Sequence, residues 1–566
     1  MSSDVAQQQF GVLNQVIGKI LQQADSLEAQ GELEQAEALL LQEIDSHGFR
    51  AELQLKLVNI SSRLKHFDIA IQSCQALLDD DDNGERWYLY AQTQERMQDW
   101  PAAKNNYLKA IEYGYDTVRV YYRLATISNL LEQEEESLAF YQQALPRFMA
   151  EEELHKEGLG FYNEWITTLI RCEQYLDTLV LLFRIIDIHK EQRLGLDKLI
   201  RRLHGVWMQE SLHHESLWCY ILLRNYPELL ETANELYLDK CVRMGYFAPE
   251  AIWLAQRIAI ESSAYSSTLK QAFYLLLIFF GIQPKVLNKV IRFVKGRRID
   301  QKLLFTLSAC LYHSQEDERL ESFLSVQKTV DLKEFAEDVP SVAWYLLQQV
   351  NTDDETSEKA RITLDSYRRV EADRYLVWRK LYASKKVAIV SNSPCELGKQ
   401  QGDTIDAHDY VVRIDNFDVA APYDADYGTK VQMHVRPGGD VEKFDLTPPE
   451  VDIVLSGIQP WLFFHRWSTV TSLLAKGGRV VFFPEQEQKE LIHRLRRAPS
   501  PGLCTTWVCA QHHPMSMTSY YGLELVNRQG EAVKSVHYWE DMQPSPRHDL
   551  QGESVLIREF LEGRKP

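Results

Sequence analysis

The sequence contains no apolar run long enough to cross a membrane and no paired cysteine motif. The longest apolar run, Ala272 to Ile282, is about half of the ~20 residues that a spanning helix needs. The eight cysteines include no C-x-x-C pair, which favours reduced thiols. The first residues, MSSDVAQQQFGVLNQ, lack the basic and apolar segments of a secretory signal. We therefore expect a cytoplasmic protein.

Positive charge is also scarce. The formal net charge is −19, which argues against nucleic acid as the main partner, because binding a phosphate backbone requires a basic surface. A small anion held in a local basic pocket remains compatible with this balance. With 566 residues, of which 45% are apolar and 25% charged, the chain has the composition of an ordinary folded protein with two or more domains.

Residues 1–150 have the spacing of a helical repeat. Large and small residues recur with a shift of 34: Trp87, Ala91, Ala103, Tyr107 and Ala110, then Tyr121, Ala125, Ser137, Tyr141 and Ala144, with an earlier pair at Ala36-Leu40 and Ala70-Cys74. Small residues let two antiparallel helices approach closely. The pattern resembles the tetratricopeptide repeat (TPR). That resemblance implies either a groove for a protein partner or for self-association, or a stack that only braces the next domain. The acidic run Asp79 to Asp82 falls in an expected inter-repeat loop.

Residues 151–380 keep helical spacing without a clear repeat, and we expect a helical array that links to the last domain. The segment Lys285 to Arg298 is amphipathic and basic. It predicts either an ordinary surface helix of the array or a peripheral contact with the inner face of an anionic membrane. The cluster His493, Arg494, Arg496 and Arg497 leaves a similar choice between an anionic partner and a solvated helix face.

From residue 384 the pattern changes to alternating strands and helices. The candidate strands are Val387–Val390, Tyr410–Ile414, Val431–Val435, Val451–Leu455 and Arg479–Phe483. Short apolar runs separated by helical or polar stretches predict a mostly parallel sheet with helices on its faces. Polar residues Ser391, Asn392 and Ser393 follow the first strand at once, a usual place for a phosphate or ribose.

The stretch Val387 to Lys430 resembles sialylmotif L of the sialyltransferases, glycosyltransferase family 29. The matching residues are Asn392-Ser393, Ile405-Asp406-Ala407-His408-Asp409, Arg413-Ile414-Asp415-Asn416 and Asp426-Tyr427-Gly428-Thr429-Lys430. The segment from Pro499 to Gly502, followed by a helix and Tyr520-Tyr521-Gly522, resembles sialylmotif S. His537-Tyr538-Trp539 resembles motif III, and His548 with Glu553 resembles motif VS. The two cysteines that join motifs L and S in animal members are replaced here, by Val387 and Met515.

The resemblance implies a Rossmann-like α/β domain, a variant of the GT-A type, over residues 384–566. It assigns the nucleotide to Ser391, Asn392, Ser393, Asp415, Asn416, Ser500, Pro501 and Gly502. Within the same set His548 is the general base, His537 the proton donor to the leaving phosphate, and Glu553 either orients His548 or caps the helix that starts near Ser554. The implied donor is CMP-sialic acid or a related CMP-linked keto-sugar acid, without a metal or other cofactor. The implied acceptor is a hydroxyl of a glycan, glycolipid or glycoprotein, and direct attack inverts the anomeric carbon.

Two other functions remain compatible with the sequence. Asp424-Ala425-Asp426 reads D-x-D, which in many glycosyltransferases holds a metal and a nucleotide diphosphate sugar, although Asp426 also belongs to the motif L match. The chain is also compatible with a TPR scaffold that carries an inactive transferase domain.

Overall fold

A computed structural model describes residues 2–150, 162–189, 193–209, 220–221, 223–327, 330–350, 352–437, 450–456, 466–524 and 548–561. The chain forms two compact units, residues 1–215 and residues 216–566. The boundary falls inside the segment 151–380 that the sequence groups as one helical array, so most of that array belongs to the same unit as the sheet.

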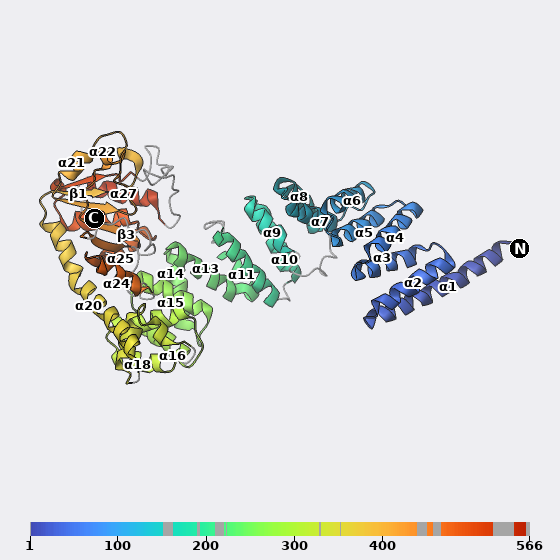
Figure 1. The fold of residues 1–566 in the computed structure, drawn as a ribbon, viewed down its shortest axis with the longest axis horizontal. Helices are drawn as coiled ribbons and strands as arrows, with labels where there is room; N and C mark the ends of the chain where they lie inside the picture. Colours follow the sequence, from blue (N-terminus) through green and yellow to red (C-terminus); the bar gives the residue numbers. More distant parts are fainter. Residues whose placement is uncertain are drawn as a thin grey trace. The chain divides into compact units, whose positions relative to one another are not determined.

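The first unit consists of helices joined in hairpins (Figure 1). Its helices are α1 (Ser2–Ala29), α2 (Leu33–His47), α3 (Ala51–Leu64), α4 (Phe67–Asp80), α5 (Gly84–Arg96), α6 (Trp100–Glu112), α7 (Val118–Leu130), α8 (Glu134–Ala150), α9 (Tyr162–Arg171), α10 (Tyr175–His189) and α11 (Arg193–Gln209). Gly31, Lys65, Gln98 and Glu132 adopt the left-handed conformation at the hairpin turns, and they lie 33 or 34 residues apart. The hairpin turns therefore recur with the period that the side chains predict, and the helical-repeat prediction is confirmed.

The small residues of the repeat lie where two helices of a hairpin meet. Ala91 and Ala103 are fully buried between α5 and α6, and Ala125 and Ser137 take the same places between α7 and α8. The acidic run begins in α4, where Asp80 is the last residue and pairs with Arg86 of α5, and it continues into the loop with Asp81 and Asp82.

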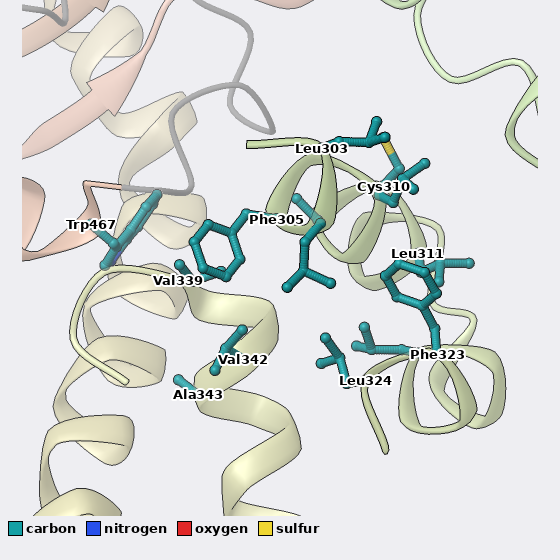
Figure 2. Close-up of a cluster of buried hydrophobic side chains, with 14 of the residues drawn as sticks. Leu303, Phe305, Cys310, Leu311, Phe323, Leu324, Val339, Val342, Ala343 and Trp467 are labelled. Carbon is teal, nitrogen blue, oxygen red and sulfur yellow. The ribbon is translucent and has the colours of Figure 1, made fainter. Parts of the chain in front are cut away.

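The second unit begins with helices α13 (Leu230–Met244), α14 (Pro249–Glu261), α15 (Ser267–Phe280), α16 (Pro284–Val294), α17 (Gln301–His313), α18 (Asp317–Ser325), α19 (Pro340–Gln348) and α20 (Asp354–Ala383). The long apolar run of the sequence lies in α15, whose residues are mostly buried. Figure 2 shows side chains of α17, α18 and α19 in one core together with Trp467. Because this core also includes Ile453 and Leu455 of the sheet, the helices and the sheet fold as one body.

Six parallel strands form the sheet of the second unit, in the order β5-β4-β3-β2-β1-β6. They are β1 (Val387–Val390), β2 (Tyr410–Ile414), β3 (Met433–Pro437), β4 (Asp452–Ser456), β5 (Val480–Phe482) and β6 (Thr518–Tyr521). The helices of this region are α21 (Gly402–Asp406), α22 (Asp424–Tyr427), α24 (Trp467–Ala475), α25 (Glu485–Leu495), α26 (Pro501–His512) and α27 (Leu550–Leu561). The predicted parallel α/β arrangement is confirmed, with five strands found within two residues of their expected bounds and β6 in addition.

Both faces of the sheet are covered, which explains the continuous apolar strands. Val387 and Ile389 point to a core shared with α25, α26 and α27. Ala388 and Val390 point to the opposite face, where they pack with Ile405 of α21 and Tyr427 of α22. The carboxyl ends of the strands are thus held on a rigid support, which is what a ligand site at that edge requires.

Candidate ligand site at the carboxyl ends of β1 and β6

The strand order reverses direction at β1. Strands β2 to β5 follow on one side of β1, and β6 lies on its other side. In open parallel sheets, ligands bind at such a switch point, in the crevice outside the carboxyl ends of the two strands. The predicted nucleotide residues after β1 lie at this place.

The backbone beyond β1 remains attached to β6. Ser391 N–H donates to Tyr521 O at 2.9 Å, and Ser393 N–H donates to Gly522 O at 3.1 Å. Gly522 has φ +66°, and a Cβ atom there would lie 2.3 Å from Ser391 O. Only glycine fits this approach, so Gly522 belongs to this edge, although the motif S resemblance that includes it implies no role for it.

Asn392 is the side chain best placed to meet a ligand at this edge. It is 5% exposed, and among the described residues its amide makes no hydrogen bond. Asn416 Oδ1 is also buried without a hydrogen-bond partner in the described part of the chain, whereas the Ser393 hydroxyl interacts with the Cys395 thiol. Buried polar atoms normally have partners, so the amides of Asn392 and Asn416 are the groups available to a polar ligand at this edge.

The amino end of α26 faces the same crevice. Ser500 is the N-cap, and its hydroxyl accepts from Leu503 N–H at 3.2 Å. A Cβ atom on Gly502 would lie 3.7 Å from Ser391 Oγ, which brings the two motif segments together. Pro501 has no N–H, and Gly502 N–H has no acceptor among the described residues. An exposed first-turn amide and the helix dipole both favour an anion.

Glu553 is fully buried beneath this turn. Its carboxyl accepts the backbone N–H of Ser500 at 2.8 Å and the Ser500 hydroxyl. Burial raises the pKa of Glu553 to about 7, while the two hydrogen bonds from Ser500 act in the opposite direction. Glu553 therefore holds the cap of α26 and not of its own helix, and its Oε1 lies 3.9 Å from His548 Nδ1.

His548 joins this network from the loop before α27. Its Nδ1 lies 2.9 Å from Ala498 O and 3.9 Å from Glu553 Oε1. A carbonyl can only accept, so Nδ1 carries the proton and Nε2 is the basic atom of the neutral ring. Glu553 lies beyond hydrogen-bond distance of Nδ1, and the Ala498 carbonyl is the hydrogen-bond partner that orients the ring through this atom. His537 lies outside the described residues.

Asp415 and Asn416 follow β2 at the same edge of the sheet. Asp415 has φ +60°, its N–H donates to Val435 O, and its carbonyl accepts from His434 Nε2 at 2.7 Å. Burial, with smaller contributions from Arg436 and Arg413, lowers the pKa of His434 to about 3, although the hydrogen bond to Asp415 O acts in the opposite direction. His434 therefore stays neutral and fixes the turn that carries Asn416.

Several motif L residues hold the framework instead of facing the crevice. Asp406 accepts from Thr429 N–H, Thr429 Oγ1 and Lys430 N–H. Arg413 is fully buried and donates to Lys430 O and Tyr427 O. These contacts join the residues that match motif L to one another. They explain the charged residues Asp406 and Arg413 by a role in folding, without a role in ligand binding.

The D-x-D sequence is engaged in the same way. Asp426 accepts from Gly398 N–H and Gln400 N–H, both at 2.8 Å, and Asp424 accepts from Ala425 N–H. Within the described residues no three histidine, cysteine or carboxylate side chains come together as metal ligands. Asp426 therefore stabilises the loop that contains Gly398 and Gln400.

Both basic segments belong to helices on the surface of the second unit, and α16 is the ordinary surface helix that the sequence offers as one alternative. Leu287, Val290 and Val294 of α16 are buried in the core, so this helix cannot insert its apolar face into a membrane. His493 stacks on Phe279 at 4.2 Å between ring centroids. His493, Arg494 and Arg496 are nevertheless exposed, so the cluster keeps the solvated face that the sequence offers as one alternative.

A cavity of about 540 Å³ lies away from the crevice, between α14, α15 and α16. Its lining includes Ile260, Leu276, Phe280 and Lys289, none of which belongs to the motifs. Lys289 Nζ donates to Ala259 O and Ile260 O, which closes the end of α14.

No protein-family profile matches the chain, and no curated protein sequence matches it. Among solved structures it is similar to MamA, with 13% identity and a TM-score of 0.26 over 30% of this chain and 95% of that one. It is similar to YrrB, described as a TPR protein with an unusual peptide-binding site, with 14% identity and a TM-score of 0.26 over 35% and 93%. A third is a thermophilic TPR protein of Thermus thermophilus, with 11% identity and a TM-score of 0.26 over 34% and 98%.

These likenesses are too low to support conclusions about activity. The sialyltransferase resemblance of the α/β part stays a prediction. Across the described part of the chain, no helix combines the length and apolar character that a bilayer span requires.

Proposed function

We propose that the second unit is a metal-independent transferase that moves a sialic acid or related keto-sugar acid from a CMP-activated donor to a glycan hydroxyl. The observation that carries this proposal is the convergence at the switch point. Ser391 after β1, Gly522 after β6 and Gly502 of α26 approach one another at one edge of the sheet. His548 contacts the segment that leads into α26, through the Ala498 carbonyl.

The crevice offers the contacts that a single phosphate requires. Gly502 N–H and the dipole of α26 supply positive potential, and the amide of Asn392 supplies donor and acceptor groups. A leaving group with one phosphate carries less charge than a diphosphate, so hydrogen-bond donors can stabilise its departure.

His548 would act through Nε2 as the base. It accepts the proton of the acceptor hydroxyl while that oxygen attacks the anomeric carbon, and the bond between this carbon and the phosphate oxygen breaks. CMP leaves and the configuration inverts. The motif resemblance assigns His537 to protonate the departing phosphate.

Calorimetric titration of the full chain with CMP, UDP and GDP tests the binding step. We expect binding of CMP alone, unchanged by a chelator. A transfer screen with several CMP-sugars and nucleotide diphosphate sugars tests turnover. Chelator-sensitive turnover with a diphosphate donor would replace our proposal with the metal-dependent alternative.

A second candidate function is a protein-binding scaffold, favoured by the regular hairpin stack of the first unit. Such stacks present extended surfaces for protein partners. This function predicts a folded protein that binds no nucleotide, together with a partner or a second copy held through residues 1–215.

A further inference from the structure

The connection between α13 and α14 lies against the segment that leads into α26. Phe247 N–H donates to Arg496 O at 2.9 Å, and Ala498 N–H donates to Gly245 O at 2.8 Å. Tyr246 and Arg497 form the antiparallel bridge between them, with the guanidinium 4.4 Å from the centroid of the tyrosine ring. Two backbone hydrogen bonds and a stacked cation thus join segments about 250 residues apart in sequence.

Gly245 allows this close approach. It has φ +59° and ends α13, and a Cβ atom there would lie 2.5 Å from Ala498 Cβ. A side chain at 245 therefore has to push Ala498 away. Ala498 is also the residue whose carbonyl accepts from His548 Nδ1 at 2.9 Å.

We propose that Gly245 is a positioning residue for His548, acting through Ala498. This inference rests on the proposed function for its catalytic meaning. The Ala498 N–H is held by Gly245 O, which anchors the backbone at the residue whose carbonyl accepts from His548. The Ala498 carbonyl then fixes the proton on Nδ1 and leaves Nε2 as the base. The helical array of the second unit therefore has a part in the chemistry, because it holds the group that orients the base.

Gly245→Ala in the full chain is the test, since its Cβ displaces Ala498. Histidine-selective 15N NMR, with His548 assigned through His548→Gln, reports the tautomer directly. We expect the Nδ1-protonated form in the unchanged protein and its loss in Gly245→Ala. The double variant Gly245→Ala/Ala498→Gly removes the Cβ–Cβ conflict, so it restores the tautomer.

Turnover provides a second, separate readout. We expect kcat to fall about 10- to 100-fold in Gly245→Ala, with KM for the donor and Kd for CMP unchanged, and to recover in the double variant. Gly296→Ala is the matched control, because Gly296 also has a left-handed φ, +74°, but open space around it.

An unchanged His548 tautomer in Gly245→Ala would overturn the positioning role, whatever the activity. Absence of turnover in every sample, including the unchanged protein, would instead overturn the proposed function, while the tautomer result still decides the positioning.

Discussion

The carboxyl group of Glu553 accepts hydrogen bonds from both the backbone N–H and the hydroxyl of Ser500, 53 residues earlier in the chain. This buried pair joins α27 to the cap of α26, so the last described helix supports the amino end of the helix that faces the candidate site.

The first prediction concerns the pH dependence of stability. The pKa of Glu553 in the folded chain is about 7, against an ordinary value of 4.5. A raised carboxyl pKa gives a stabilising contribution that is complete below pH 4.5 and is lost as the pH rises through about 7. Glu553→Gln removes this dependence, so the stability difference between the two proteins should change by about 3 kcal/mol over that window.

Scanning calorimetry at several pH values measures that difference for the unit of residues 216–566. A constant difference between pH 4.5 and 7.5 would show that folding does not raise the pKa of Glu553.

The second prediction concerns Asn392→Ala. Loss of one or two hydrogen bonds to the nucleotide should weaken CMP binding about 10-fold, with little change in stability because the amide has no partner among the described residues. Calorimetric titration and a melting curve on the same sample check both parts. Equal CMP affinity in the variant would remove Asn392 from the nucleotide site.

The third prediction concerns Gly522→Ala. Its Cβ would lie 2.3 Å from Ser391 O, so the two strand ends must separate, and we expect both a lower melting temperature and loss of CMP binding. Gly398→Ala is the control, since Gly398 has φ +78° and no atom near its missing Cβ. If the two variants lose the same melting temperature and the same CMP affinity, the loss comes from the left-handed backbone conformation alone and not from the contact with Ser391.

The fourth prediction separates folding from chemistry within motif L. Asp406 accepts three hydrogen bonds from Thr429 and Lys430, so Asp406→Ala should destabilise the second unit by about 2–4 kcal/mol. Asp403→Ala, an exposed acid on the same short helix, should change little. Denaturant unfolding measures both. A stable Asp406 variant without turnover would instead indicate a direct role in the reaction.

The sequence predicts the parts of this structure that depend on local patterns. The 34-residue recurrence of small residues is local, and it agrees with the hairpin stack. The β-branched apolar runs are also local, and they give five strands. β6 was not predicted because Thr518–Tyr521 is an edge strand, with only Thr518 buried, so it lacks the continuous apolar run of a central strand. Its flanking Pro514 and Gly522 and its tyrosines were the available signal.

Contacts between distant segments could not be predicted. Nothing near Arg497 in the sequence indicates that it stacks on Tyr246, and nothing near Glu553 indicates that it supports Ser500. The roles of Ala498 and Gly245 follow only from three-dimensional contacts, because neither residue has reactive chemistry of its own. His548 was singled out by resemblance, and its orienting partner became visible only in the structure.

The shared core of α17, α18, α19 and the sheet determines where this chain can be divided for expression. A fragment starting at residue 384 would leave Trp467, Val480 and Phe482 without the side chains that cover them, and we expect such a fragment to aggregate. Recombinant work on the α/β part should instead begin near residue 216, so that its helical cover is synthesised with it.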